Sequence, residues 1–571
     1  MTLLRPIPRM GADGRFLLGL LVVTALLWVP RLRGPIDLRW DAGVYYMLGT
    51  SLAEGDGYRL PNEPRPIRAI QYPPLLATVA AAHQTLLGTD DPVVVGSWLR
   101  RLYLALTFCY AAGAFALCRR FLPSGEAFLA GLITILNPQT LFFSDVFMAD
   151  LPFAVVTVLF LLVVTGKAPT RQLLGGILAV AAFGLRATGL ALLAGWAGES
   201  LLQRQWKALA LRAALTAAVF GGWHAYTSSV KSSLEYRQPD YAYQRAHYQF
   251  YNVDYSDNSR YVDPFRPELG VVASDAAIER LAGNVSRLPA AVGESVSIQK
   301  SWWKGEIQHL NDGLGGPWLP QWLASVAVIT ISLPVLAGLV LLGLQGQLLV
   351  PLYAAASLAL IAITPWSNQF TRYMVPLTPI FALGLLNSYV RVSSRAASRE
   401  ARHWRVAKAV LAGGLTIALV QEMVTVGSMF ATHHDRTSYM DASGTHPYKL
   451  FYFDEPWQDH DGSLRWLAAH GAAGAIVATS TPPLVYLRTG LKAVMPPYEP
   501  APATAQYLLD GVPATYLLVD SLDSPDVARR YLEPVLVAYP ERWRLVYGPT
   551  AGGTRVYQRV KENGPLVSGS K

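Results

Sequence analysis

The sequence feature that most constrains the fold is a series of apolar runs, each about 17 to 23 residues long and almost free of charge. At a rise of about 1.5 Å per residue, a helix of that length crosses the roughly 30 Å hydrocarbon core of a bilayer. The composition agrees, since 52% of the 571 residues are hydrophobic and only 15% are charged. Soluble proteins carry about 25% charged residues. The sequence therefore predicts a polytopic α-helical membrane protein.

We expect about eleven transmembrane helices, separated by loops in which arginine and lysine gather. This is the positive-inside pattern, and it accounts for the net charge of +9 without a nucleic-acid partner. The first run follows Arg5, Arg9 and Arg15 and lacks a small-residue cleavage site. We interpret it as an uncleaved signal anchor of a multi-pass inner (plasma) membrane protein, with a cytoplasmic N-terminus. The spans are expected near residues 16–33, 98–118, 127–143, 151–166, 172–185, 188–203, 210–226, 322–343, 348–364, 373–390 and 409–428.

Residues 72–88 are apolar enough to form a further span. If they crossed the membrane, every later loop would invert. The pair Arg119 and Arg120 and the basic cluster that follows Arg391 would then all lie outside. We therefore predict an interfacial helix for this segment, with an ordinary span as the alternative.

Three stretches are then expected on the outer side of the membrane: residues 34–97, 227–317 and 430–571. We take residues 1–429 as the transmembrane module, which contains the first two stretches as outer loops, and residues 430–571 as an extracytoplasmic domain. This last stretch alternates helix and strand patterns and predicts a soluble α/β fold. It contains no GxGxxG or P-loop motif, so we assign it no chemistry of its own.

The first candidate site residues follow the first span. Asp41 precedes an amphipathic pattern whose aromatic residues, Tyr45 and Tyr46, mark a membrane surface. An ionisable group at the lipid boundary is a candidate for function, although a solvated loop carboxylate is the alternative. We take Asp41 as a candidate catalytic residue and Tyr45 as a candidate substrate contact.

Two more carboxylates lie between apolar runs. Asp145 ends the third predicted span and Asp150 begins the fourth. A carboxylate in such a position is costly unless it is paired or faces water. For Asp145 a structural ion pair, for example with Arg186, is at least as good an interpretation as catalysis, and we keep Asp145 as a candidate substrate contact. Asp150 is the better candidate for catalysis.

Two arginines lie at expected outer ends of spans. Arg186 is at the tip of a hairpin that is otherwise uncharged, and Arg372 and Tyr373 are at the mouth of a later span. A guanidinium at the lipid boundary can bind a phosphate through paired hydrogen bonds, whereas snorkelling to the headgroups is the alternative.

The outer loop 227–317 is rich in tyrosine and tryptophan, which could stack on sugars but are also typical of an interfacial belt. The ten histidines are scattered, which argues against a dedicated zinc site. A divalent metal ion held by carboxylates stays open as a cofactor.

Taken in order, these residues resemble the GT-C class of multi-spanning glycosyltransferases, in particular bacterial relatives of protein O-mannosyltransferases and of the lipid A aminoarabinose transferase. The resemblance is carried by Asp41 in RWDAGVYY, a GDGY turn, the YPPL segment, Asp150, and the Arg372-Tyr373-x-x-Pro376 motif, followed by an outer α/β domain.

The resemblance implies an inverting transfer of a sugar from a polyprenyl-phosphate donor, of the undecaprenyl type, to a glycan, lipid or protein acceptor on the outer face. It makes Asp41 the general base, while Arg186, Arg372 or a metal ion would stabilise the leaving phosphate. The aminoarabinose transferase has a basic residue just before its Pro-Pro-Leu, where this chain has Gln71 and Tyr72. Arg68, or the nearby Arg65, is the candidate replacement.

A transporter or lipid flippase is the competing class, because the same carboxylates and arginines could form a translocation path. Such proteins commonly contain two repeated halves and helices interrupted near the midplane, and we see neither pattern in the sequence. A membrane scaffold without catalysis is a third interpretation. We favour the transferase.

Overall fold

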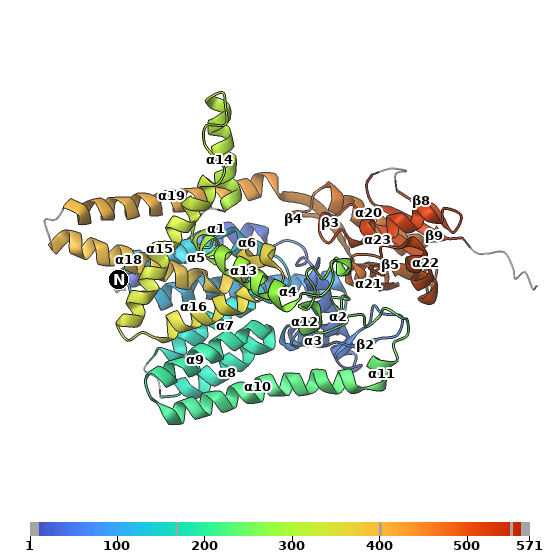
Figure 1. Cartoon of the computed structure of the whole chain (residues 1–571), viewed down its shortest axis with the longest axis horizontal. Coiled ribbons are helices and arrows are strands. Elements are labelled where there is room, and N and C mark those ends of the chain that lie inside the picture. Colours follow the sequence, from blue (N-terminus) through green and yellow to red (C-terminus); the bar gives the residue numbers. More distant parts are fainter. Residues whose placement is uncertain (1–10, 167–168, 298, 399–401, 549–551, 561–571) are drawn as a thin grey trace, which may run out of the picture. The chain divides into compact units, whose positions relative to one another are not determined.

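The computed structural model describes residues 11–166, 169–297, 299–398, 402–548 and 552–560. The chain forms two compact units (Figure 1). The described residues of unit 1 fall within Met1–Ile36, Gly96–Trp223 and Ser274–His434, and those of unit 2 within Asp37–Val95, His224–Ala273 and Asp435–Lys571. The two stretches expected as outer loops, 34–97 and 227–317, are therefore divided differently between the units. Most of the first and the first half of the second join the C-terminal domain in unit 2.

Most helices of unit 1 follow the predicted apolar runs, whereas Ser274–Glu294 and Lys300–Gly313 form two helices within the stretch 227–317, which was expected as an outer loop. The helices of unit 1 are α1 (Ala12–Trp28), η1 (Val29–Arg31), α4 (Pro92–Arg119), α5 (Ser124–Leu136), α6 (Pro138–Phe143), α7 (Asp150–Val164), α8 (Arg171–Leu185), η2 (Ala187–Gly189), α9 (Leu190–Leu202), α10 (Trp206–Ser232), α13 (Ser274–Glu294), α14 (Lys300–Gly313), α15 (Leu323–Leu344), α16 (Leu349–Ala362), η4 (Ser367–Gln369), α17 (Phe370–Tyr373), η5 (Val375–Leu377), α18 (Thr378–Ser398) and α19 (Arg402–Thr432).

Among the residues that the structure describes, five helical stretches are long and apolar enough to cross a membrane, judged by length and composition: Ala12–Arg31, Pro92–Arg119, Leu323–Leu344, Ser367–Ala397 and Arg402–Thr432. Shorter apolar helices accompany them, among them α5, α7, α8 and α16. The chain is thus a polytopic helical membrane protein, as predicted, and the number of eleven crossings stays a prediction.

One predicted span is wrong in detail. The run 127–143 is not one helix, because it breaks at Asn137 between α5 and α6. The side chain of Asn137 accepts hydrogen bonds from the backbone N–H groups of Gln139 and Thr140, so it caps α6. Pro138 cannot continue the hydrogen-bonding ladder. The span expected over residues 373–390 lies within the helical stretch Ser367–Ala397, whose long helix α18 begins at Thr378 after a short turn that contains Pro376.

Helices α15 and α18 cross at very close range through two glycines (Figure 1). A Cβ atom on Gly338 would lie 1.7 Å from the carbonyl oxygen of Gly384, and one on Gly384 would lie 2.5 Å from the carbonyl oxygen of Val335. The close approach lets Asn387 donate to the Gly338 carbonyl at 2.9 Å and Ser388 to the Pro334 carbonyl at 2.7 Å. Small residues at a crossing combined with interhelical hydrogen bonds are how helices associate where lipid surrounds them.

In unit 2, α2 (Asp41–Ala53) packs along α3 (Leu75–Leu87), and the short strands β1 (Arg59–Leu60) and β2 (Ile67–Arg68) lie between them in sequence. The segment 72–88 thus contains a helix of 13 residues. At about 1.5 Å per residue this helix is near 20 Å long, less than the hydrocarbon core. Whether this helix lies at the membrane interface, as predicted, or spans the membrane stays open. The short helices α11 (Leu234–Arg237), α12 (Tyr255–Asn258) and η3 (Pro267–Leu269) complete the non-C-terminal part of the unit.

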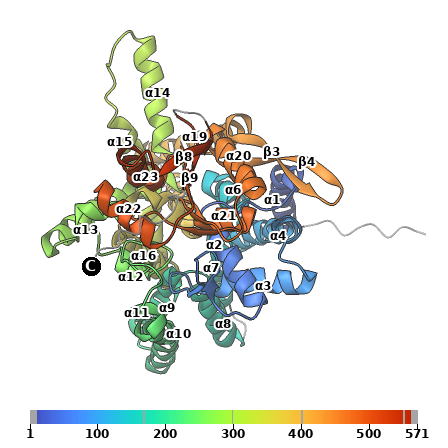
Figure 2. The same ribbon diagram turned by 90° about the vertical axis from the view of Figure 1, so that its right-hand side faces the viewer.

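The C-terminal domain contains the predicted α/β fold. Its sheet has the order β6-β5-β7-β9-β8, with β5 parallel to β6 and β7, and β9 antiparallel to β7 and β8. Figure 2 shows the helices of this domain grouped around these strands. The elements are β3 (His434–Asp441), β4 (Gly444–Phe451), α20 (Glu455–His470), β5 (Ile476–Ala478), α21 (Pro482–Thr489), β6 (Lys492–Val494), α22 (Pro502–Gly511), β7 (Tyr516–Val519), α23 (Val527–Ala538), β8 (Trp543–Tyr547) and β9 (Arg555–Arg559).

Both faces of the central strand β7 are buried. Leu517 and Val519 pack in a cluster with residues of α22 and α23, whereas Tyr516 and Leu518 pack with residues of α20 and α21. A strand covered on both sides has a continuous apolar sequence, here Tyr516–Val519 (YLLV), in place of an alternating one. The hairpin β3–β4, by contrast, was not predicted.

Glu63 joins the segments of unit 2 from its interior. It is 2% exposed and accepts hydrogen bonds from the Tyr241 hydroxyl at 2.8 Å and from the side-chain amides of Gln244 and Asn252 at 2.9 Å each. Burial raises the pKa of Glu63, although these hydrogen bonds oppose the rise. The neighbouring Asn62 exchanges hydrogen bonds with the backbone of Ala493 in β6. One short segment therefore ties the first and second stretches to the C-terminal sheet.

The carboxyl ends of β5 and β7 carry a buried polar pair. Ser480 follows β5 and donates to the carboxylate of Asp520, which follows β7. Burial raises the pKa of Asp520 from 3.8 to about 6. Nearby, burial lowers the pKa of His460 to about 3, so this ring is neutral, and its Nε2 lies 2.9 Å from the Thr481 hydroxyl.

We expect Gly384→Ala to weaken the crossing of α15 and α18, because the new methyl group would overlap the Val335 carbonyl. Such overpacking costs about 1–3 kcal/mol. Thermal denaturation in detergent should show a lower midpoint than for wild type. Gly413→Ala on α19 is the control, because nothing lies within 4 Å of its new Cβ. Equal midpoints for the two variants would contradict this account of the crossing.

We also expect Asp520 to make stability depend on pH. A carboxyl whose folded-state pKa is raised stabilises the fold fully below its unfolded pKa of 3.8 and loses that contribution as the pH rises through about 6. Two pKa units correspond to about 3 kcal/mol. Between pH 4.5 and pH 7.5 the melting temperature of wild type should therefore fall relative to that of Asp520→Asn. Parallel curves would show that Asp520 titrates normally.

Candidate functional site

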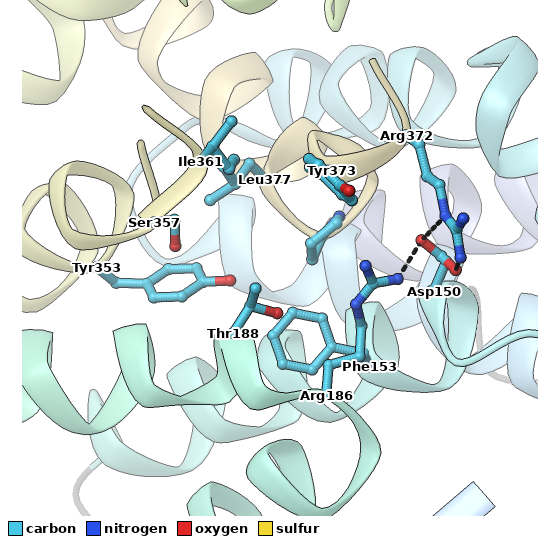
Figure 3. Close-up of a pocket in the computed structure, with 11 residues that line it drawn as sticks. Asp150, Phe153, Arg186, Thr188, Tyr353, Ser357, Ile361, Arg372, Tyr373 and Leu377 are labelled. Carbon is cyan, nitrogen blue, oxygen red and sulfur yellow. Dashed lines mark hydrogen bonds and ion pairs between the residues drawn. The ribbon is translucent and has the colours of Figure 1, made fainter. Parts of the chain in front are cut away.

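Three of the predicted site residues meet in unit 1. Both Asp150 carboxylate oxygens are bound by Arg372, with Nε 3.1 Å from Oδ1 and Nη2 3.1 Å from Oδ2. Arg186 donates from Nη1 to the same Oδ1 (Figure 3). Asp150 is only 1% exposed, whereas the side chains of Arg186 and Arg372 are 17% and 19% exposed. The carboxylate is therefore enclosed, and each guanidinium keeps an open side.

Local structure explains how each group reaches this point. Asp150 is the first residue of α7, where the partial positive charge of the helix N-terminus favours a carboxylate. Arg186 is the extended residue between α8 and η2. The turn that follows is so tight that a Cβ on Gly189 would lie 2.5 Å from the backbone nitrogen of Phe183. Arg372 is on α17, a single turn set between η4 and η5.

Aromatic rings fix the arginines from the other side. Arg186 lies over the ring of Tyr373 at 5.6 Å, and Arg372 lies over the ring of Phe143 at 5.4 Å. These cation–π contacts limit where each guanidinium can move. The predicted residue Tyr373 thus belongs to the same cluster.

A cavity opens beside the cluster, with about 380 Å³ of empty space including the part that meets solvent. Its lining adds four hydroxyl-bearing side chains to the two arginines, those of Thr188, Tyr353, Ser357 and Tyr373. Figure 3 shows the Tyr353 hydroxyl directed toward the side of the cavity that holds Thr188. Apolar side chains form the rest of the wall: Phe153, Ile361, Pro376 and Leu377.

The charges of the cluster do not cancel. Two guanidinium groups and one carboxylate leave one positive charge in apolar surroundings. Arginine prefers planar anions with two oxygens, such as carboxylate and phosphate. The cavity is therefore suited to an anionic group attached to an apolar or hydroxyl-bearing molecule.

Asp145 forms a second cluster of the same composition. Its carboxylate binds Arg31, at 3.2 Å, and Arg100. All three side chains are at most 5% exposed. Arg100 also donates to the backbone carbonyls of Arg33 and Pro35. The ion pair suggested for Asp145 therefore exists, but its partners are Arg31 and Arg100 and not Arg186.

The remaining predicted residues belong to unit 2. Asp41 is the first residue of α2, partly exposed, and the Tyr251 hydroxyl lies 3.5 Å from its Oδ1. Tyr45 is buried, with its ring 4.8 Å from that of Tyr72. The positive charge of Arg68 is already paired, because both its backbone N–H and its side chain contact the carboxylate of Glu235.

Several residues of these clusters were not singled out from the sequence. Tyr353 and Ser357 are four residues apart on α16, so they share one helix face, and a polar pair within an apolar run was a usable signal. Arg100 was treated as part of a span.

Within the described parts of the chain, no group of three or more His, Cys, Asp or Glu side chains is placed to hold a metal ion.

Comparison with known proteins gives a fold. No family model matches the sequence. No curated protein matches it either. Among solved structures, the archaeal oligosaccharyltransferase AglB from Archaeoglobus fulgidus, in complex with an inhibitory peptide and a dolichol-phosphate, has a TM-score of 0.52 at 15% identity, over 98% of this chain and 76% of AglB.

ArnT from Cupriavidus metallidurans is similar to the same degree. Its apo structure has a TM-score of 0.52 at 13% identity, over 96% of this chain and 99% of ArnT. The structure bound to undecaprenyl phosphate has a TM-score of 0.51 at 14% identity, over 97% of this chain and 100% of ArnT. AglB and ArnT are GT-C glycosyltransferases. The chain therefore has the GT-C fold, and the resemblance found in the sequence is confirmed at the level of the fold.

We expect Asp150→Asn to be strongly destabilising, because it leaves two mostly buried guanidinium groups without a counter-charge. Removing one partner of a buried pair costs about 3–5 kcal/mol. Asp461→Asn is the matched control, since Asp461 also bridges two arginines, Arg465 and Arg488, which are 63% and 39% exposed. Surface pairs contribute at most about 1 kcal/mol. Thermal denaturation of both variants in detergent should separate them clearly, and similar midpoints would contradict the burial argument.

Proposed function

We propose that the protein is an inverting glycosyltransferase that moves a sugar from a polyprenyl-phosphate donor, of the undecaprenyl type, to an acceptor on the extracytoplasmic face of the inner membrane. The observation that carries the proposal is the cluster of Asp150, Arg186 and Arg372 beside a cavity, in a chain with the GT-C fold. The bound molecules of the neighbours support it: ArnT binds undecaprenyl phosphate, and AglB binds a dolichol-phosphate and a peptide.

In this proposal the two arginines bind the donor phosphate. When the glycosidic bond breaks, negative charge grows on the leaving phosphate oxygens, and positioned cations stabilise that charge. The three side chains together carry a formal charge of +1, which can balance part of the negative charge of a phosphate. Asp150 then positions the guanidinium groups, because its two oxygens are already engaged by both of them.

Asp41 acts as the general base. The acceptor hydroxyl attacks the anomeric carbon from the face opposite the phosphate, so a new carbon–oxygen bond forms while the bond to the phosphate oxygen breaks and the configuration inverts. Asp41 takes the hydroxyl proton, and the lipid phosphate leaves with the bonding electron pair. Tyr251, whose hydroxyl lies 3.5 Å from Oδ1, can orient the carboxylate.

A divalent metal ion stays open as a cofactor. Asp145 and Asp150 are each already engaged by two arginines in this structure. The steps above use only side chains of this chain. An assay with and without a divalent metal ion tests the point directly.

The test is a reconstitution assay with purified protein in lipid and a panel of radiolabelled polyprenyl-phosphate sugars. Wild type should consume one donor and thereby identify the sugar. Asp41→Asn should reduce transfer at least about 100-fold while binding the donor normally. Arg372→Ala should raise the Kd for the donor roughly 10- to 100-fold, since charge-assisted hydrogen bonds contribute about 1.5–3 kcal/mol.

Two controls make the assay decisive. Asp275→Asn, at the exposed start of α13, and Arg119→Ala, an exposed arginine paired with Asp13, should both behave as wild type. Wild-type turnover by Asp41→Asn would remove the proposed base, and an unchanged Kd in Arg372→Ala would remove the proposed phosphate contact. If wild type consumes no donor, with or without metal and a crude acceptor extract, the transporter interpretation moves ahead.

A further inference from the structure

The chain that leads into Asp41 is fixed by one buried arginine. Arg39 is 3% exposed. Its Nε and Nη2 atoms bind the Asp37 carboxylate at 2.7–3.1 Å, while Nη1 donates to the Tyr452 carbonyl and Nη2 to the Phe451 carbonyl, each at 2.6 Å. The planar guanidinium thus joins the start of the first outer segment to the chain at the end of β4.

Aromatic rings enclose the same guanidinium. Its central carbon lies 4.4 Å from the ring of Trp40, 4.8 Å from that of Trp457 and 5.2 Å from that of Phe453. Trp40 and Trp457 also meet edge to face, with their centroids 5.4 Å apart. Trp457 belongs to α20, so the cation and its rings unite residues from opposite ends of the sequence within unit 2.

The backbone next to Asp41 is strained. Trp40 has φ 56° and ψ −137°, a region that residues with a Cβ rarely adopt. A strained residue persists only where its surroundings hold it, and such residues concentrate at functional sites. Here the surroundings are Arg39 and the Trp457 ring, and the residue that follows is the first residue of α2, Asp41.

A second contact, at Gly43, packs the first turn of α2 against the C-terminal domain. A Cβ on Gly43 would lie 3.0 Å from the Leu38 carbonyl oxygen and 3.2 Å from the Pro483 side chain in α21. No other residue type fits without displacing one of them. The start of α2 is therefore fixed both by the chain before it and by α21 below it.

The surface that receives Trp40 is the edge where open α/β sheets usually bind their ligands. Strand β5 lies between β6 and β7 in the sheet and is parallel to both. The chain passes from β5 to β6 on one side and then returns to β7 on the other side. The order of the strands therefore reverses between β5 and β7, and ligands of open α/β sheets usually bind at the carboxyl ends of such strands. Leu522, just past β7, and Trp457 pack with Trp40 in one apolar cluster. The usual ligand position of this fold holds a segment of the same chain.

We infer that Arg39 is a positioning residue, which together with Trp40 sets the Asp41 carboxylate for proton transfer, and that the C-terminal α/β domain is thereby part of the catalytic apparatus. The inference rests on the proposed function, in which Asp41 is the general base. It gives the C-terminal domain a role that its own sequence motifs do not supply.

The test compares turnover and donor binding in Arg39→Gln. Misplacing a catalytic group by about 1 Å can reduce a rate on the order of 100-fold. We therefore expect kcat to fall about 10- to 100-fold while the Kd for undecaprenyl phosphate changes less than about 3-fold. Arg39→Lys should recover part of kcat, because an ammonium can pair with Asp37 but cannot reach both carbonyls as well. Asp37→Asn in the Arg39→Gln background should add little, since the two residues act through one contact.

Arg559→Gln is the matched control. Arg559 belongs to the same unit and makes the same kinds of contact: it donates to the Leu509 and Ala514 carbonyls, pairs with Asp510, and lies 4.8 Å from the Trp543 ring. Its loss should also lower the melting temperature, although by less than the loss of Arg39, because the Arg559 side chain is 28% exposed, and it should leave kcat unchanged. Equal losses of kcat in Arg39→Gln and Arg559→Gln, or an unchanged kcat in Arg39→Gln, would overturn the inference.

Hydrogen exchange gives a readout that needs no activity. In full-length protein in lipid nanodiscs, backbone amides of residues 40–48 should exchange faster in Arg39→Gln and at the wild-type rate in Arg559→Gln. Unchanged exchange in Arg39→Gln would overturn the inference whatever the enzyme does. If wild type shows no donor turnover, the proposed function fails, and faster exchange in Arg39→Gln alone would still establish that Arg39 fixes the Asp41 segment.

Discussion

The cost of burying charge in an apolar interior is the constraint on which unit 1 depends. Two carboxylates, Asp145 and Asp150, lie five residues apart, and each is bound by two arginines. The arginines come from η1, α4, the turn after α8, and α17, so elements distant in sequence must converge on the short segment that joins α6 to α7. The Tyr103 hydroxyl donates to the Met148 carbonyl in the same segment at 2.6 Å. Charge pairing, added to apolar packing, thereby fixes which helices become neighbours.

The two clusters have the same charges but different access to solvent. The arginines around Asp145 are 5% and 4% exposed, whereas those around Asp150 are 17% and 19% exposed and line a cavity. A closed cluster of this kind can only support the fold. In the second cluster the side chains of Arg186 and Arg372 stay partly exposed at the cavity, and the enclosed carboxylate limits how far their guanidinium groups can turn. The difference in exposure, and not the residue types, separates a structural cluster from a candidate binding site.

Local patterns in the sequence were enough for the helices and for most of the C-terminal sheet. Apolar runs and the YLLV segment of β7 are recognisable without knowledge of the rest of the chain. Arg186 was identifiable because no other charge lies near it in sequence. Arg39 was not, since it lies in a polar segment among other charges, and its partners Phe451, Tyr452 and Trp457 are more than 400 residues away. The break at Asn137 was missed because an apolar run looks the same whether it forms one helix or two.

The buried contacts of Glu63 and Asn62 bear on when this protein becomes complete during synthesis. Glu63 needs partners from the stretch 224–273, and Asn62 needs Ala493 in β6, near the end of the chain. The segment 37–95 therefore leaves the ribosome several hundred residues before the sheet that completes its packing. Until the last stretch has been made and folded, the earlier segments of unit 2 lack their buried partners. This segment acquires its final structure only at the end of biogenesis, so a chain truncated before β6 would leave the unit unfinished.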